Sequence, residues 1–285
     1  ALGEELRDTI EDIINWKKKS IGLKNDDTLF NNKFLQNAGD TSVDWYPIGI
    51  GRVGYEDDYE SYLAVINDVV EKRYEERHKL GKAKSTEWHR ISLAILAAGG
   101  NPREVGTDQA GKSIDLIADG TYNRGETRSL GAQGLNGWIW GLIALDSLRY
   151  KVPEDAHETR KDIIENILSS QLKDGGFALM LSDNQDIDIT AMALQALAPY
   201  YNSEETYTYN QLVLDQEVTK TVRQVVDEAL DSLSEAQLSD GEFASWDTPN
   251  VESTVQVIVA LTSLGIDPLT DERFIKDGNN LLDVL

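Results

Sequence analysis

Two carboxylates stand two residues apart in the run Asp186-Ile187-Asp188-Ile189-Thr190-Ala191. A carboxylic acid protonates an unreactive substrate group only when its neighbours keep it protonated in a pocket that excludes water. Two acidic side chains that flank a glycosidic bond can also cleave it, one as general acid and the other as base or nucleophile. If this protein is an enzyme, Asp188 and Asp186 are therefore the candidate catalytic residues. In a glycosidase, Asp44 or Glu252 is the candidate partner of Asp188.

Polar and aromatic side chains also recur at the starts of the predicted buried helices. An Ala-Leu or Ala-Ile pair recurs along the chain, and counting back eight residues from it gives Thr86, Asn136, Asp188 and Glu252. We expect these helix starts to meet at one mouth lined by aromatic and polar groups, a composition typical of ligand sites. The candidate ligand-binding residues are Asp44, Trp45, Tyr46, Trp88, His89, Arg90, Asn136, Trp138, Trp140, Thr190 and Glu252.

A structural interpretation of the same residues stays open. Asp, Asn and Thr at a helix start commonly cap its free N–H groups, and Glu there complements the helix dipole. A Trp on an apolar helix commonly belongs to the core.

The elements that must position these residues are repeated. Gln171-Leu-Lys-Asp-Gly-Gly-Phe177 recurs as Gln237-Leu-Ser-Asp-Gly-Glu-Phe243. Each copy follows an amphipathic helix and precedes a helix that is apolar nearly all round. The first kind of helix has one wet face, whereas the second must be buried on every side. Two concentric rings satisfy both demands, so we predict an all-α fold, an α/α-toroid of helical hairpins.

The pattern predicts six outer helices and five inner ones. The outer helices are expected at 4–18, 57–77, 108–118, 157–172, 217–236 and 271–284, and the inner ones at 43–54, 86–98, 134–148, 187–200 and 251–264. No segment shows a strand period, and 120–136 and 202–216 are expected to be long loops. Residues 1–285 are thus predicted to form a single toroid domain without its final inner helix. Its open side could support self-association.

Composition narrows the possible partners. The 285 residues include 50 Asp and Glu against 27 Lys and Arg, a formal net charge of −23. This surface repels nucleic acid and anionic membranes, and no apolar run reaches the roughly 18 residues of a membrane span. Without cysteine, thiolate metal sites and cysteine nucleophiles are excluded. We expect no metal and no cofactor, although Asp186 and Asp188 with loop carbonyls leave a calcium site as an alternative.

The repeated motif followed by Asp-Ile-Asp-Ile-Thr-Ala-Met-Ala-Leu resembles the repeat of squalene-hopene cyclases and protein prenyltransferase β-subunits. The same toroid occurs in the α-domain of vitamin B12 carriers such as intrinsic factor and transcobalamin. The chain also resembles secreted or cell-surface prenyltransferase/squalene-oxidase-repeat proteins of gut Clostridia. That resemblance rests on segments such as Asp44-Trp-Tyr-Pro-Ile-Gly49, Thr86-Glu-Trp-His-Arg90 and Gly137-Trp-Ile-Trp-Gly-Leu-Ile-Ala-Leu145. It implies a toroid secreted by, or displayed on, a Gram-positive bacterium.

The resemblance also bears on activity. The cyclases carry Asp-x-Asp-Asp-Thr-Ala, in which the second Asp is the general acid. Asp188 matches that acid, but Ile189 stands at the position of the third Asp. The prenyltransferases need a zinc site of Asp, Cys and His, and this chain has no Cys. We therefore predict a non-catalytic toroid that binds a small molecule or glycan at its aromatic mouth. The alternatives are an enzyme of terpenoid-cyclase or glycosidase type using Asp188, and a structural or adhesive surface module.

Overall fold

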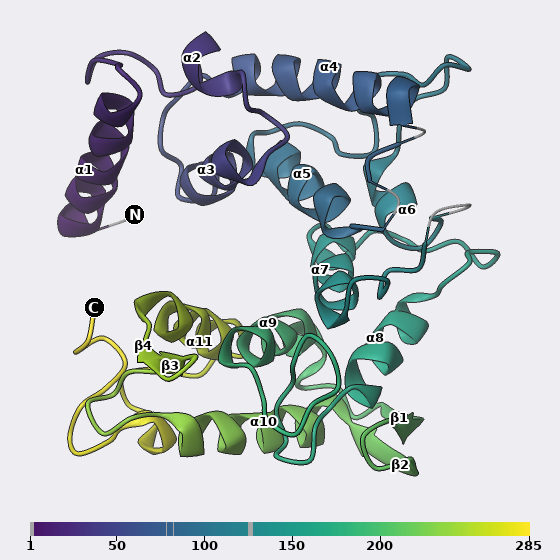
Figure 1. The fold of residues 1–285 in the computed structure, drawn as a ribbon, viewed down its shortest axis with the longest axis vertical. Helices are drawn as coiled ribbons and strands as arrows, with labels where there is room; N and C mark the ends of the chain where they lie inside the picture. Colours follow the sequence, from purple (N-terminus) through teal and green to yellow (C-terminus); the bar gives the residue numbers. More distant parts are fainter. Residues whose placement is uncertain (1–2, 78, 82, 125–127) are drawn as a thin grey trace. The chain divides into compact units, whose positions relative to one another are not determined.

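A computed structural model describes residues 3–77, 79–81, 83–124 and 128–285 of the chain (Figure 1). The chain divides into two compact units. Unit 1 comprises residues 1–128 and 147–149, and unit 2 comprises residues 129–146 and 150–285. Among the described residues, no helix has the length and apolar character to span a bilayer.

Unit 1 is built from helices. They are α1 (Glu4–Ser20), α2 (Asn32–Leu35), α3 (Thr41–Arg52), α4 (Tyr59–Arg77), α5 (Thr86–Ala97) and α6 (Leu116–Gly120). Helix α5 packs against both α3 and α6 and buries most of its residues. The largest core side chains around it include Phe30, Tyr62 and Trp88. The inner helices predicted at 43–54 and 86–98 are therefore confirmed as α3 and α5.

Unit 2 has two layers of helices. Its elements are α7 (Leu135–Asp146), α8 (Arg160–Ser169), α9 (Ile187–Leu197), the 3₁₀ turn η1 (Ala198–Tyr200), α10 (Val222–Ala236), α11 (Val251–Ser263) and the 3₁₀ turn η2 (Glu272–Phe274). Helix α9 packs between α7 and α11. In the second layer, α8 packs against α7, and α10 packs against α9 (Figure 1). The apolar helices α7, α9 and α11 form the predicted inner layer, and the amphipathic α8 and α10 form the outer one.

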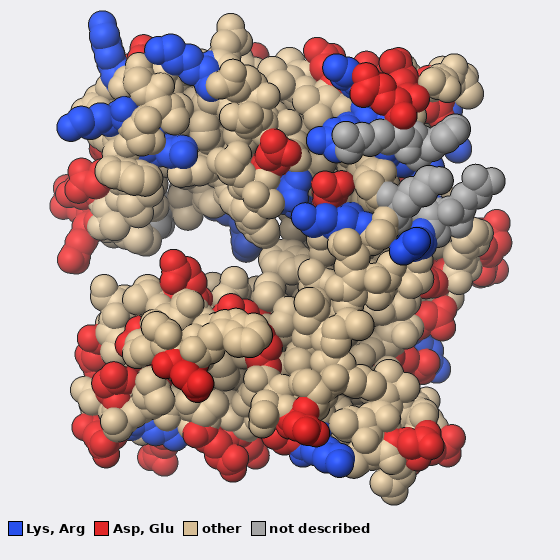
Figure 2. Space-filling model, in the orientation of Figure 1, with Lys and Arg blue, Asp and Glu red and all other residues tan. Residues whose placement is uncertain are grey.

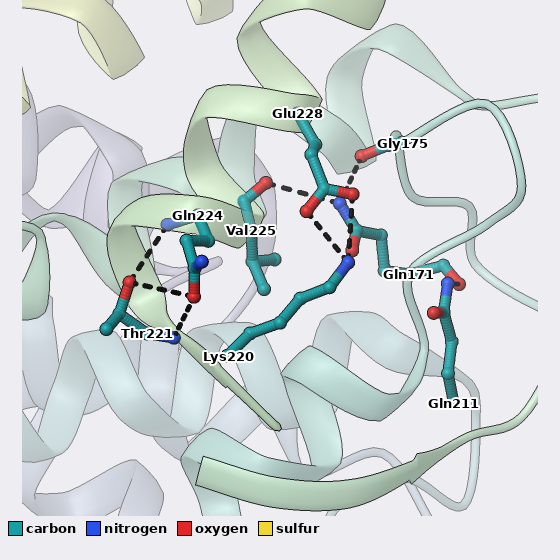
Figure 3. Close-up of polar contacts among 8 residues, drawn as sticks. All are labelled: Gln171, Gly175, Gln211, Lys220, Thr221, Gln224, Val225 and Glu228. Carbon is teal, nitrogen blue, oxygen red and sulfur yellow. Dashed lines mark hydrogen bonds and ion pairs between the residues drawn. The ribbon is translucent and has the colours of Figure 1, made fainter. Parts of the chain in front are cut away.

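The repeated glutamine ties the layers together. The side-chain amide of Gln171 donates to the carbonyl of Gly175 at 2.8 Å and to that of Val225, on α10, at 3.2 Å (Figure 3). In the second copy, Gln237 donates to Gly241 at 2.9 Å and to Phe274, in η2, at 3.0 Å. Each glutamine thus closes its own tight turn and holds the next outer segment of the chain.

A threonine on each inner helix completes the motif. Thr190 Oγ1 accepts from the Phe177 backbone N–H at 2.9 Å, and Thr254 Oγ1 accepts from that of Phe243 at 3.1 Å. Both threonines are fully buried. These hydrogen bonds therefore attach the loop before α9 and the loop before α11 to their inner helices in the same way.

The structure contains β-hairpins, and the expectation of none was wrong. Strands β1 (Thr206–Gln211) and β2 (Gln216–Thr221) pair antiparallel, with Thr206 opposite Thr221 and Gln211 opposite Gln216. Tyr207 and Tyr209 are buried while Thr206 and Thr208 are exposed, which is the period of a half-buried strand. The alternation of Tyr and Thr carried this signal within the predicted loop. A two-residue pair, β3 (Ala244–Ser245) with β4 (Thr248–Pro249), lies between α10 and α11.

Three predicted outer helices are shorter than expected or absent, because β-structure or a turn occupies part of each segment. Residues 105–114 form a hairpin with a bridge between Thr107 and Ser113, so the helix expected at 108–118 is only α6. Helix α10 begins at Val222 because β2 occupies the preceding residues. No α-helix forms in the described segment 271–284. There, η2 is followed by a bridge between Lys276 and Asn279. Asp277 and Gly278, at the tip, both have positive φ, as the Asp-Gly sequence of a tight hairpin turn requires.

Candidate functional site

Two neighbouring loops of unit 2 enclose a hollow of about 670 Å³. One loop precedes α9 and the other is the β3–β4 hairpin before α11. The residues that line the hollow are Ala178, Leu179, Met180, Leu181, Ser182, Asp183, Asn184, Gln185, Asp186, Ile187, Ala244, Ser245 and Trp246. The hollow therefore lies at the starts of two adjacent inner helices.

Trp246 stands at the tip of the β3–β4 hairpin and is 92% exposed. Its φ is +51° and that of Asp247 is +60°, so both central residues of the turn are left-handed. A two-residue turn of this kind normally holds Asn and Gly, and a larger side chain costs about 1 kcal/mol there. The hairpin thus holds a large aromatic ring in solvent at a conformational cost. Sequence reasoning missed Trp246, although Ala-Ser-Trp-Asp-Thr follows directly on the second copy of the repeated motif.

The loop before α9 lines the hollow with apolar and polar side chains. Leu179, Met180 and Leu181 are all exposed large apolar residues. Ser182, Asp183 and Asn184 follow them in the same loop. An apolar surface with a few converging polar groups has the composition of a ligand site.

The surroundings of the hollow are strongly acidic. Unit 2 carries 27 Asp and Glu against 8 Lys and Arg, a formal charge of −19, whereas unit 1 carries 23 against 19, a charge of −4. Figure 2 shows red acidic side chains spread over unit 2 with few blue ones between them. Most of the net charge of the protein therefore belongs to the unit that holds the hollow.

The start of α7 lies at the same end of unit 2 as the hollow. The backbone N–H of Leu135, its first residue, donates to the carbonyl of Leu179 in the loop before α9 at 2.9 Å. Asn136, Asp188 and Glu252 are the second residues of α7, α9 and α11. The structure thus brings together these three predicted helix starts. Thr86 begins α5 in unit 1.

The two candidate catalytic carboxylates have different surroundings. Asp186 is the N-cap of α9, and its side chain accepts the Ile189 N–H at 2.9 Å. Asp188 is partly buried, and its Oδ1 is shielded from solvent without a hydrogen-bond partner among the described residues. The same holds for Oδ1 of Asn136. Asp186 therefore has a structural role, while Asn136 and Asp188 keep unused acceptor atoms near the hollow.

The other predicted residues of unit 2 differ in accessibility. Thr190 is fully buried, and its hydroxyl is engaged with Phe177 and Gln185. Trp138 and Trp140 are partly buried. The indole nitrogen of Trp138 lies against Gly131, where a Cβ would be only 2.1 Å away. Glu252 is exposed on the first turn of α11.

In unit 1, Asp44 and Arg90 form a buried ion pair. Arg90 Nε donates to Asp44 Oδ2 at 3.0 Å, and the other oxygen accepts from Gly39 N–H and Tyr62 O–H at 3.0 Å each. Burial raises the pKa of Asp44, while the hydrogen bonds from Gly39 and Arg90 act against this increase. The pair joins α3 to α5. Both side chains were predicted to line an open mouth, and that prediction was wrong because both are buried.

Trp88 and His89 also lie in the core of unit 1. Trp88 is fully buried, with its indole N–H 3.4 Å from the Tyr74 hydroxyl and the Arg124 guanidinium 4.9 Å from its ring centre. His89 Nε2 donates to the Gly120 carbonyl at 2.6 Å. The expectation that these two side chains line an accessible mouth was wrong, because both are buried in the core around α5.

Trp45 and Tyr46 flank a separate, almost wholly apolar groove of about 430 Å³ between α1 and α3. Ile10, Ile13 and Ile50 complete its walls. Tyr46 also meets Phe34 edge to face at 5.3 Å. These two residues are thus accessible, but in unit 1.

His89 is expected to make stability depend on pH. Burial lowers the pKa of His89 from its ordinary 6.5 to about 3. Between these values the unfolded chain binds a proton that the folded chain does not, so stability falls as the pH decreases, by up to about 1.4 kcal/mol per unit. The variant His89→Gln keeps a donor for Gly120 but cannot ionise. Urea denaturation from pH 7 to pH 4 should show the wild type losing more stability than this variant, and parallel curves would contradict the assignment.

Within the described part of the chain, no group of three or more His, Asp or Glu side chains is arranged to hold a metal ion. The calcium alternative, which uses Asp186, Asp188 and loop carbonyls, stays a prediction.

Hairpins of helices in an inner and an outer layer define the class of this protein as all-α, of the α/α-toroid type, and the predicted fold class is confirmed. Residues 121–212, about one third of the chain, match the family model of the prenyltransferase alpha-alpha toroid domain. No curated protein and no solved structure matches the chain. That residues 1–285 form one domain lacking a final inner helix stays a prediction.

Proposed function

We propose that this protein is a non-catalytic, secreted or cell-surface toroid that binds a small molecule or a glycan. The binding surface is the hollow of unit 2 between the loop before α9 and the β3–β4 hairpin. The observation that carries this proposal is Trp246, an indole held in solvent on a left-handed turn at the rim of the hollow. The surface location rests on the sequence resemblance.

The hollow has the size and chemistry for such a ligand. Its volume of about 670 Å³ falls within the range of small-molecule pockets, about 300 to 1,000 Å³. The flat face of Trp246 can stack against the apolar face of a sugar or another ring. Ser182, Asp183 and Asn184 offer hydrogen-bond partners to polar groups of the same ligand.

Two features favour binding over catalysis. The Asp186 carboxylate is engaged as the cap of α9. Ile189, mostly buried, stands where the cyclases have a third acid that supports the catalytic one. The set of acids that supports the general acid of the cyclases is therefore incomplete around Asp188.

Replacing Trp246 by Ala is expected to weaken ligand binding about fivefold, because stacking on an exposed indole contributes about 1 kcal/mol. The melting temperature should hardly change, since the side chain packs against little. The measurement is binding of the purified protein to an array of neutral and charged glycans, followed by calorimetry on the best ligand.

The matched control is Trp16→Ala, which removes another exposed tryptophan, on α1 of unit 1. This control should bind like the wild type. If Trp246→Ala also binds like the wild type, the hollow is not the binding surface.

A further inference from the structure

We infer that the ligand of the unit 2 hollow is an organic cation, an amine or quaternary ammonium group carried on an apolar body. This inference rests on the proposed function and specifies the class of ligand for the same hollow.

The charge around the hollow is uncompensated. Of the 13 residues that line it, all of which the structure describes, Asp183 and Asp186 are acidic and none is Lys or Arg. Asp247 adjoins Trp246 on the hairpin, and Glu252 is exposed on the first turn of α11. An anionic ligand would meet this negative field in a partly enclosed space, whereas a cation would be attracted and concentrated by it.

The basic residues of unit 2 do not offset this field, because several are paired elsewhere. Arg160 pairs with Asp146 at 2.9 Å, Lys220 with Glu228 at 2.8 Å and Arg273 with Asp271 at 2.8 Å. The paired residues belong to α7, α8, β2, α10 and the η2 turn with its cap, and none of them lines the hollow. These three cations are held beside their own partners, and no Lys or Arg lines the hollow.

The positive ends of α9 and α11 would otherwise attract an anion. However, the Asp186 carboxylate caps the Ile189 N–H, and the Asn250 side chain caps that of Ser253. Asp188 and Glu252 add negative charge to the first turns. The two helix starts are thus already satisfied by the protein's own side chains.

The apolar part of the hollow specifies the rest of the ligand. A cation over an indole face gains about 0.5 to 2 kcal/mol, more than over other aromatic rings. Trp246 offers such a face, and Leu179, Met180 and Leu181 in the loop before α9 offer apolar contact to the same hollow. A cationic group with methyl or ring substituents uses both features, whereas a small hydrated metal ion uses neither.

Choline and 3,3-dimethylbutan-1-ol, which have the same shape but differ in charge, provide the test. Each is titrated into the full chain while indole fluorescence and heat are followed, at about 20 mM and 300 mM NaCl. Choline should bind about tenfold more tightly, and raised salt should weaken it. A second pair, glucosamine oligomers against N-acetylglucosamine oligomers of equal length at pH 6, tells whether the amine is best presented on a sugar. Preference for either charged member supports the inference, and equal or weaker binding of both charged members overturns it.

Asp183→Asn should weaken binding of the preferred cation about threefold or more and leave its neutral counterpart unchanged. Asp231→Asn, which removes an exposed acid on α10, is the control for the loss of one charge. If a neutral glycan binds in a Trp246-dependent way while the cations do not compete, the proposed function stands and this inference fails. If no probe binds and Trp246→Ala changes nothing on the glycan array, both fail.

Discussion

Replacing Gly175 by Ala is expected to lower the free energy of unfolding by about 3 kcal/mol. Gly175 has φ +92°, a conformation that costs any residue with a Cβ about 1 to 2 kcal/mol. The new Cβ would also lie 2.7 Å from the backbone oxygen of Glu228 on α10, which cannot move as a side chain could. Relieving that overlap requires separating the turn from α10, and the hydrogen bond from Gln171 to Val225 would lengthen (Figure 3).

The repeat supplies an independent copy of this experiment. Gly241 has φ +94°, and its Cβ would lie 2.7 Å from the backbone oxygen of Asn280. Gly241→Ala should therefore cost a similar amount. Both are measured by urea denaturation monitored by circular dichroism.

Gly49→Ala is the matched control. This glycine lies inside α3, and apart from its chain neighbours and the local helix backbone no atom lies within 4 Å of the position of its Cβ. The substitution should stabilise the protein by about 0.5 to 1 kcal/mol, because glycine is a poor helix former. If Gly175→Ala and Gly49→Ala shift stability in the same direction, the close packing of the motif turn against α10 is wrong.

The inner helices were predictable because their pattern is strong. Thr190–Leu197 and Thr254–Leu261 are apolar nearly all round, and most of their side chains are buried, although Val255 and Val259 on α11 are exposed. The outer segments carry weaker patterns, so local turn chemistry decides them. Asp277-Gly278 forms a hairpin turn where a helix was expected, and Tyr207 with Tyr209 pairs β1 to β2. An apolar stripe at helical spacing does not outweigh a turn sequence placed inside it.

The candidate site was predictable only in part. The offset from the aligned alanines correctly places Asn136, Asp188 and Glu252 in the first turns of α7, α9 and α11. Trp246 belongs to a loop, where no helical period indicates its direction. The pairing of Asp44 with Arg90 joins residues 46 positions apart, and a single sequence contains no signal for such a contact.

That buried pair gives the second large effect. Replacing Arg90 by Met is expected to destabilise the protein by about 3 to 5 kcal/mol, because the fully buried Asp44 carboxylate would lose its counter-ion. Gly39 and Tyr62 would still donate to it, but two neutral donors do not replace the charge. Unfolding in urea at pH 7 measures the loss.

Two comparisons separate a lost charge from lost packing. Adding Asp44→Asn to Arg90→Met removes the unpaired charge and should recover a substantial part of the stability. The single variant should also approach the wild type as the pH falls. Without Arg90 the pKa of buried Asp44 rises further above its unfolded value, so protonation then favours the folded state. A deficit that persists unchanged at low pH and in the double variant would mean that Arg90 acts through the packing of its aliphatic stem, and that the ion pair itself contributes little to holding α3 against α5.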